Sequence, residues 1–352
     1  MRYAGRYEVR YSLRGHPFYV WKRFMPRIND KIVDSVVYLY PSVDAAKDGE
    51  RFGGTGFLVS VPSEVHEGWR YQYCVTNSHV IREAASPVVR LNTNEGGLDI
   101  VPLQQDHWWH HQFGDDLAVC SLDLNNPEYY KYSSIDTSLF VTKDFIEQQN
   151  IGPGDDVFMV GRFVSHQGRQ RNTPVVRFGN ISMMPGESIR NARGLLQESF
   201  LIETRSLSGF SGSPVFLYIT PVSPRPAQYV QPEQGTWLLG VDWGHMRTFE
   251  AVMEKDGKTP VSEEWVVPSN SGQMGMVPAW TLLELLDREE LLSMRRQADD
   301  LRTRHIDESP AVFDAHKPIQ DDTTATESLT QNAFENALDR VSRPEKKPDE
   351  AS

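Results

Sequence analysis

The chain has 352 residues, 39% of them hydrophobic and 24% charged, and its formal net charge is −12. This length allows a sizeable core in one large domain or two smaller ones, and the composition is that of an ordinary globular protein. The acidic balance disfavours nucleic acid or an anionic membrane surface as the main partner, and no apolar run is long enough to span a bilayer.

Residues 1–30 are interpreted as a basic N-terminal extension rich in arginine and tyrosine. The spacing of the arginines near four would place them on one helical face, but Gly5 and Gly15 disfavour a helix. An anionic partner for this segment is one alternative, and a solvated or partly docked extension is the preferred one. The basic start is followed by no apolar core and no small-residue cleavage site, so we expect no secretory signal and a cytoplasmic location.

The chain from residue 31 to residue 279 is a series of short β-branched and aromatic runs separated by glycine turns. Almost no helical period interrupts them, which favours an all-β sandwich or a pair of barrels. The only cysteines, Cys74 and Cys120, make no disulfide framework, and we expect buried thiols. Strands are predicted at residues 32–40, 71–76, 88–91, 99–103, 157–161, 175–183, 200–204, 216–219, 237–244 and 274–279, and a turn that leads into a strand is predicted at 53–61 and at 114–122.

The period changes after the last predicted strand. Apolar residues at helical spacing predict one long helix over 280–303. Beyond residue 306 the sequence is polar and contains proline, so a disordered tail is expected. Within that tail, residues 328–341 approach a helical period, and either a transient helix or docking on a partner would account for them. The predicted division is a 1–30 extension, barrels over 31–138 and 139–279, a helix over 280–304 and a tail over 305–352.

Ser211 stands between two glycines in the segment 209–212, directly before an apolar run. Glycines allow a tight turn that exposes the Ser211 hydroxyl and aims the N–H groups of Gly209 and Ser211 at one point, as an oxyanion hole requires. On this stretch alone, a Gly/Ser-rich loop entering a strand is an equal alternative. A serine nucleophile also needs a base and an acid that orients the base.

His79 and Asp116 supply these partners. His79 follows a predicted strand and Asp116 precedes one, and both are positions from which a scaffold can present a side chain to a cleft. The order His79, Asp116, Ser211 is the one found on paired β-barrels. Asp115 is an alternative to Asp116, because only one of two adjacent acids can face His79.

Residues 106–111, with the sequence DHWWHH, raise the alternative of a metal site. The segment lacks cysteines and a second ligand cluster at helical spacing. We prefer a loop that packs its tryptophans near the cleft, and we expect neither a metal nor a cofactor.

Four segments in this order resemble the signatures of trypsin-like, chymotrypsin-fold serine peptidases, and most closely the bacterial domains that lack disulfides. The resemblance spans about residues 32–303. It implies two packed antiparallel Greek-key β-barrels with a C-terminal helix. It also implies that His79 is the general base and then acid, that Asp116 orients its imidazole, and that Ser211 attacks the acyl carbon. The segments are 54–57 (GTGF), 75–80 (VTNSHV), 116–119 (DLAV) and 209–215 (GFSGSPV).

The same resemblance assigns substrate-binding positions. Asp242, Trp243 and Gly244 match the strand edge that holds the substrate backbone, and Arg205 lies near the floor of the specificity pocket. An inward Arg205 would favour an acidic residue at the cleavage position, whereas an outward one would be a surface arginine. Phe210 replaces the aspartate that pairs with a freshly cut N-terminus in the secreted animal enzymes, which predicts no activation by N-terminal cleavage.

The predicted function is that of a serine endopeptidase acting through an acyl-enzyme on a protein or peptide, with no nucleic-acid or membrane partner. The main rival is a latent or inactive protein that keeps the fold as a scaffold. A Gly-x-Ser-x-Gly esterase is disfavoured, because Ser213 stands in place of the final glycine and the histidine and acid precede the serine.

Overall fold

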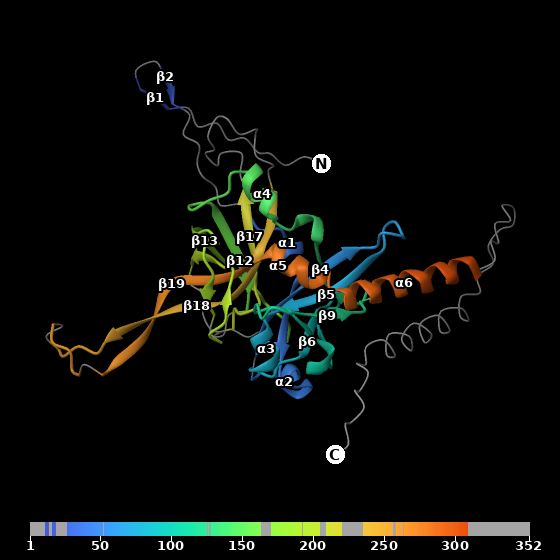
Figure 1. Cartoon of the computed structure of the whole chain (residues 1–352), viewed down its shortest axis with the longest axis horizontal. Coiled ribbons are helices and arrows are strands. Elements are labelled where there is room, and N and C mark those ends of the chain that lie inside the picture. The colour runs from blue at the N-terminus through green and yellow to red at the C-terminus, as the bar shows by residue number, and fades with distance from the viewer. Residues whose placement is uncertain are drawn as a thin grey trace.

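Two large β-sheets form the body of the computed structural model, and a long ribbon and a helix project from it in opposite directions (Figure 1). The all-β architecture agrees with the prediction. The described residues are 11–13, 16–18, 27–51, 53–124, 126, 128–162, 170–191, 193–204, 209–219, 235–255, 258–262 and 264–308. Most of the N-terminal extension and most of the predicted tail lie outside them, but residues 305–308 form the end of the last helix, where a disordered tail was expected.

The first sheet has nine strands in the order β10-β6-β3-β4-β5-β9-β8, with β11 paired to β4 and β7 paired to β6. It curls without closing, whereas a closed barrel was expected here. Its neighbours along that order pair antiparallel, and only β11 on β4 is parallel. The strands are β3 (Val36–Tyr40), β4 (Gly54–Pro62), β5 (Arg70–Thr76), β6 (Val88–Thr93), β7 (Leu98–Val101), β8 (Trp109–His110), β9 (Ala118–Leu122), β10 (Tyr130–Lys131) and β11 (Ile135–Asp136).

The second sheet is a closed barrel in the order β12-β13-β16-β19-β18-β17. A small hairpin, β14 (Ile189–Arg190) with β15 (Leu196–Gln197), lies on the connection between β13 and β16. A further short pair, β1 (Tyr11–Leu13) with β2 (His16–Phe18), precedes the body. The barrel strands are β12 (Asp156–Gly161), β13 (Val175–Met183), β16 (Phe200–Glu203), β17 (Pro214–Ile219), β18 (Gly235–Ala251) and β19 (Val266–Pro278).

Side chains alternate along the strands between two different apolar cores. In β12, Val157 and Met159 fill the interior of the second barrel, while Phe158 and Val160 join a core shared by both sheets. The first sheet divides in the same way, because successive side chains of a strand point to opposite faces. This is why the strands read as continuous apolar runs: both of their faces are buried.

The helices are short apart from the last. They are α1 (Asp30–Val33), α2 (Val43–Asp48), α3 (Ser78–Arg82), α4 (Lys143–Gln148), α5 (Ala279–Leu286) and α6 (Glu289–Glu308), with 3₁₀ turns at Gln105–His107 and Thr137–Leu139. Two sequence predictions are wrong here. The strand expected over 32–40 begins only at Val36, because the Asn29 side chain accepts a hydrogen bond from the Lys31 N–H and caps α1.

The helix expected over 280–303 is interrupted after α5. Arg288 donates to the His110 carbonyl at 2.9 Å, which ties the break to the first sheet. Arg295 of α6 donates to the Leu286 carbonyl at 2.9 Å and so satisfies the end of α5. No helix in the described part of the chain is long and apolar enough to cross a membrane.

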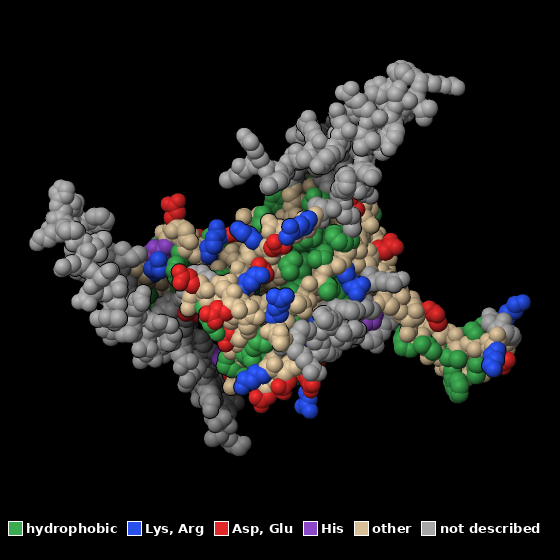
Figure 2. All heavy atoms as spheres, turned by 180° about the vertical axis from the view of Figure 1, so that it is seen from behind, with side chains coloured by type: hydrophobic (Ala, Val, Ile, Leu, Met, Phe, Trp, Pro, Cys, Tyr) green, Lys and Arg blue, Asp and Glu red, His purple; other side chains and the backbone are tan. Residues whose placement is uncertain are grey.

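The ribbon, formed by the outer halves of β18 and β19 and their tip (residues 247–270), was not predicted. It leaves the barrel and exposes apolar side chains, as Figure 2 shows, with Phe249 67% and Trp265 60% exposed. Only the inner halves of the two strands matched a buried apolar pattern in the sequence. The outer halves pair with nothing but each other among the described residues.

Cys74 and Cys120 face each other across β5 and β9, and both thiols are free and buried, as the sequence predicts. Burial raises the pKa of each thiol.

Candidate active site

His79 lies in α3, the short helix that begins directly after β5, and it contacts the carboxylate of Asp116. Its ring Nδ1 is 2.5 Å from Asp116 Oδ2, and its backbone N–H donates to Asp116 Oδ1 at 3.0 Å. The Asn77 side chain donates to the Asp116 carbonyl at 2.8 Å, which joins the end of β5 to the loop before β9. Asp116 is buried, so its carboxylate is held in a fixed orientation against the imidazole.

Asp116, and not Asp115, is therefore the acid that faces His79. Asp115 turns to the other side, where its Oδ2 is 2.9 Å from Nδ1 of His111. The chain turns tightly at Asp116, where the Leu117 N–H donates to the Asp115 carbonyl at 2.7 Å, and Leu117 is buried in the core shared by the sheets.

The histidines of residues 106–111 do not converge on one point. His107 Nδ1 accepts from the Gln104 N–H at 2.9 Å, and His110 Nδ1 lies 2.8 Å from Ser78 Oγ. Within the described ranges no group of three or more histidine, cysteine, aspartate or glutamate side chains is placed to hold a metal ion.

Ser211 stands in a tight turn entering β17. Gly209 and Gly212 have φ angles of +93° and +87°, which favour glycine, and the Ser213 N–H closes the turn on the Phe210 carbonyl at 2.8 Å. A Cβ on Gly212 would lie 2.0 Å from the Thr55 carbonyl oxygen. The loop therefore requires glycine at this position.

Hydrogen bonds from β4 fix this loop beside the element that carries His79. The Thr55 N–H donates to the Ser211 carbonyl at 2.9 Å, and the Thr55 hydroxyl donates to the Gly209 carbonyl at 2.7 Å. The Thr76 hydroxyl, three residues before His79, donates to the Thr55 carbonyl at 2.7 Å. The serine loop of the second barrel is thus bound to the strands of the first sheet that lead to His79.

The backbone N–H groups of Gly209 and Ser211 and the Ser211 hydroxyl are the groups that the sequence assigns to catalysis. Among the described residues, neither backbone N–H donates to a protein acceptor, and no hydrogen bond joins Ser211 Oγ to His79. Catalytic hydrogen bonds are often long in unliganded enzymes and tighten when substrate binds.

The charge environment of His79 favours its protonated form. Burial lowers the pKa of the imidazole, but the hydrogen bond and negative charge of Asp116, with a further contribution from Glu83, outweigh this and raise the pKa above 6.5. Arg193 opposes the rise. The neighbouring His110 behaves in the opposite way, since burial and the cations Arg82 and Arg193 lower its pKa to about 4.

The predicted substrate strand forms the middle of β18. Asp242 is buried, and its Oδ1 accepts from the Gly244 N–H at 2.8 Å across a bulge in the pairing with β19. Trp243 packs on Gly275 and donates to Ser199 Oγ at 3.2 Å. The side chains of Asp242 and Trp243 therefore hold the strand. Arg205 lies outside the described residues.

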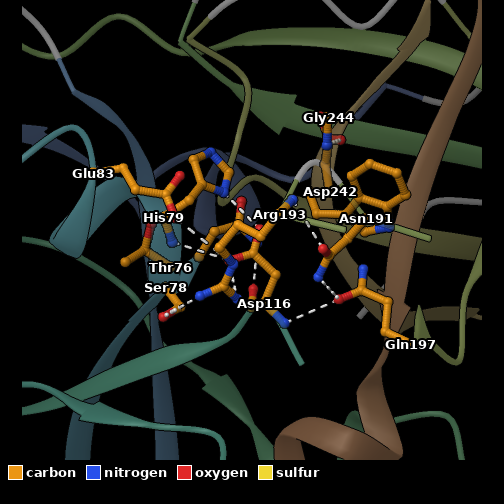
Figure 3. Close-up of polar contacts among 12 residues, drawn as sticks. Thr76, Ser78, His79, Glu83, Asp116, Asn191, Arg193, Gln197, Asp242 and Gly244 are labelled. Carbon is orange, nitrogen blue, oxygen red and sulfur yellow. Dashed lines mark hydrogen bonds and ion pairs between the residues drawn. The ribbon is translucent and has the colours of Figure 1, made fainter. Parts of the chain in front are cut away.

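Four polar residues at the site were missed from the sequence: Thr55, Asn191, Arg193 and Gln197. Figure 3 shows the last three gathered at Asp116, where Gln197 Oε1 accepts from the Asp116 N–H at 3.1 Å. Thr55 lies in the segment 54–57 that resembles the peptidase signature, but nothing in the sequence indicated that its hydroxyl contacts the serine loop. The others lie in the β14–β15 hairpin, which no motif covers.

A comparison with protein-family models matches residues 54–218 to a trypsin-like peptidase domain. The match begins at β4, ends in β17 and includes His79, Asp116 and Ser211. Residues 54–218 are therefore similar to a trypsin-like peptidase domain, and the fold is that of the trypsin-like serine peptidases. This agrees with the resemblance seen in the four sequence segments and with the two-sheet architecture.

A comparison with curated protein sequences found no match to this chain. Among solved structures, the MamO protease domain from Magnetospirillum magneticum in its apo form is similar, with 17% identity, a TM-score of 0.43 and coverage of 73% of this chain and 98% of that one. Deg5 is 17% identical, with a TM-score of 0.35 and coverage of 72% and 88%. An inactive serine-to-alanine mutant of Rv3671c from M. tuberculosis H37Rv is 15% identical, with a TM-score of 0.38 and coverage of 74% and 90%.

Proposed function

We propose that the protein is a serine endopeptidase that hydrolyses peptide bonds through His79, Asp116 and Ser211. The observation that carries this proposal is the contact between His79 and Asp116, in which one carboxylate takes both the ring and the backbone N–H of the histidine. The contact leaves Nε2 as the ring nitrogen that can accept a proton. The turn that presents Ser211 is bound to the strands that lead to this histidine.

In the proposed reaction His79 Nε2 takes the proton of the Ser211 hydroxyl as its oxygen attacks the acyl carbon. The imidazolium that forms is stabilised by Asp116, and the N–H groups of Gly209 and Ser211 receive the oxyanion, each contributing about 3 kcal/mol to transition-state stabilisation. His79 then donates the proton to the leaving amine. Water, activated by the same imidazole, hydrolyses the acyl-enzyme and regenerates Ser211.

A serine-directed fluorophosphonate probe tests this proposal directly. The purified protein should be labelled, and Ser211→Ala and His79→Ala variants should not. A peptide library should be cleaved by the wild type alone. Labelling that persists in Ser211→Ala would remove Ser211 as nucleophile, and absence of labelling in every form would favour a latent or scaffold protein.

The cleavage preference and the cellular location are further proposals. An acidic residue at the cleavage position follows if Arg205 points into the specificity pocket, and the cytoplasm remains the proposed location. Profiling the library with wild type and Arg205→Ala tests the first of these, since an unchanged preference would exclude Arg205 from the pocket.

A further inference from the structure

Arg193 connects the β14–β15 hairpin of the second barrel to the acid that orients His79. Its Nη2 donates to Asp116 Oδ1 at 3.2 Å and to the Gly114 carbonyl at 3.3 Å. Asp116 Oδ1 is the oxygen that also accepts the His79 backbone N–H, while Oδ2 faces the ring. The guanidinium therefore holds the carboxylate at the oxygen that does not face the imidazole ring (Figure 3).

The same guanidinium also contacts the helix that carries His79. Its Nη1 donates to Ser78 Oγ at 3.3 Å, and its Nε lies 3.8 Å from a carboxylate oxygen of Glu83. Because an arginine can only donate, Ser78 Oγ accepts here and directs its own proton to His110 Nδ1 at 2.8 Å. The low pKa of His110 keeps that ring neutral and able to accept. One side chain thus spans α3 and the loop before β9.

The hairpin is built to hold Arg193 in place. The Asn191 side-chain oxygen accepts the backbone N–H groups of Arg193 and Leu195, both at 3.0 Å, and the Asn191 N–H donates to the Leu195 carbonyl at 2.8 Å. Asn191 also donates to Gln197 Oε1 at 3.0 Å, the atom that accepts from the Asp116 N–H. Asn191, Gln197 and Asp116 are all buried, so these bonds form in a low dielectric where they are strong.

We propose that Arg193 is a positioning residue, through which the β14–β15 hairpin fixes the orientation of the Asp116 carboxylate and so aligns the imidazole of His79. This inference rests on the proposed function for its catalytic meaning. Three charged side chains bear on His79, namely Asp116, Glu83 and Arg193, and only Arg193 comes from the second barrel. Proper alignment of His79 thus requires the two sheets to be docked.

Replacing Arg193 removes a positive charge and one anchor of the carboxylate. The pKa of His79 should rise in Arg193→Gln, because the cation that opposes its protonation is gone, and the acid limb of the pH profile of kcat/KM should move to higher pH. Misalignment of the imidazole should lower kcat about 10- to 100-fold while KM changes little. Arg193→Lys keeps the charge but not the fork that reaches Asp116 and Ser78 together, so its pH profile should stay near wild type while kcat recovers in part.

Arg190→Gln is the matched control. Arg190 lies on the same hairpin, and among the described residues its side chain makes a hydrogen bond to the Gly194 carbonyl and none to Asp116 or His79. It should keep the wild-type kcat and pH profile. Equal losses in Arg190→Gln and Arg193→Gln would overturn the proposal, because the effect would then come from the fold of the hairpin. Wild-type kcat and an unchanged His79 pKa in Arg193→Gln would overturn it as well.

A proton NMR titration of the His79 Nδ1–H signal separates this inference from the proposed function, because it requires no turnover. The signal should titrate at higher pH in Arg193→Gln than in wild type, and addition of methylguanidine to Arg193→Ala should move it back. If the wild type hydrolyses nothing but these shifts occur, the positioning role stands and the peptidase proposal fails. If the signal is the same in all variants, the positioning role fails.

Discussion

The hydroxyl of Thr55 joins the two sheets at the serine loop: it donates to the Gly209 carbonyl at 2.7 Å and accepts from the Arg162 N–H at 3.0 Å. Thr55 is fully buried, so both bonds are shielded from water. Gly209 belongs to the turn that would supply the oxyanion hole. The conformation of this turn therefore depends on a side chain of the other sheet.

Thr55→Val should impair both activity and stability. The substitution keeps the shape but leaves a buried carbonyl and a buried N–H without partners, at about 1–3 kcal/mol each. Thr55→Ser, which retains the hydroxyl, serves as the control and should stay close to wild type. Urea unfolding and the rate of fluorophosphonate labelling measure the two effects, and a stable, fully reactive Thr55→Val would show that the bond has no role.

Gly212→Ala should be far more damaging than Gly68→Ala, although both glycines have positive φ, of +87° and +80°. An added Cβ meets nothing within 4 Å at Gly68, so only the backbone strain remains, about 1–2 kcal/mol. At Gly212 the Cβ would lie 2.3 Å from Thr76 Oγ1 as well as against the Thr55 carbonyl, which adds about 1–3 kcal/mol for overpacking. Free energies of unfolding for the pair measure the difference, and equal values would contradict the close approach.

The pair formed by His79 and Asp116 predicts a pH dependence with a definite sign. Since the pKa of His79 is raised by folding, protonated His79 contributes stability that is complete below pH 6.5 and is lost as the pH rises through the folded pKa. Asp116→Asn removes the largest favourable contribution, so the stability advantage of the wild type over this variant should shrink as the pH rises from 6.5 through the folded pKa of His79. A constant difference over that range would argue against the raised pKa.

In Asp116→Asn, kcat should also fall by about 10⁴-fold, because an asparagine leaves the imidazole of His79 in the wrong tautomer. Asp115→Asn, whose side chain faces His111, is the control and should keep most of the activity. Steady-state assays on a peptide found by library cleavage compare the two.

The exposed apolar side chains of the ribbon should bind apolar molecules without adding to the stability of the folded protein. Phe249→Ser and Trp265→Ser should change the free energy of unfolding by no more than about 0.5 kcal/mol, because both side chains are exposed. They should, however, lower the binding of an apolar dye such as ANS. Phe200→Ala, in the interior of the second barrel, is the contrast and should cost about 3–5 kcal/mol. A large loss of stability in the ribbon variants would mean that the ribbon is covered in solution.

The sequence predicted the parts of the fold in which local pattern and tertiary burial agree. Strands β4, β5 and β12, whose buried residues form apolar runs, lie within a residue of prediction, and β13 has the predicted bounds although only Ile181 of it is buried. The outer ribbon was not predicted, because its strands bury no face and strand prediction depends on a buried apolar pattern. The helix break at Arg288 was not predicted, because Arg288 contacts His110, which is far away in the chain.

The candidate site divides in the same way. His79, Asp116 and Ser211 were visible because each stands next to a strand end in a recognisable segment, and the structure places Asp116 rather than Asp115 against His79. Arg193 was not visible, because its importance comes from a hairpin that approaches Asp116 only after the two sheets dock. Such contacts depend on the relative placement of elements, which residue spacing does not encode.

The buried thiols Cys74 and Cys120 make it possible to measure how often the first sheet opens. In the folded chain both are shielded and poorly ionised, so a thiol reagent such as DTNB must wait for β5 and β9 to separate. The reagent then reports how often the sheet holding His79 and Asp116 opens, independently of turnover. Since β5 leads directly into α3, the rate of that opening bounds the lifetime of the assembled histidine–aspartate pair.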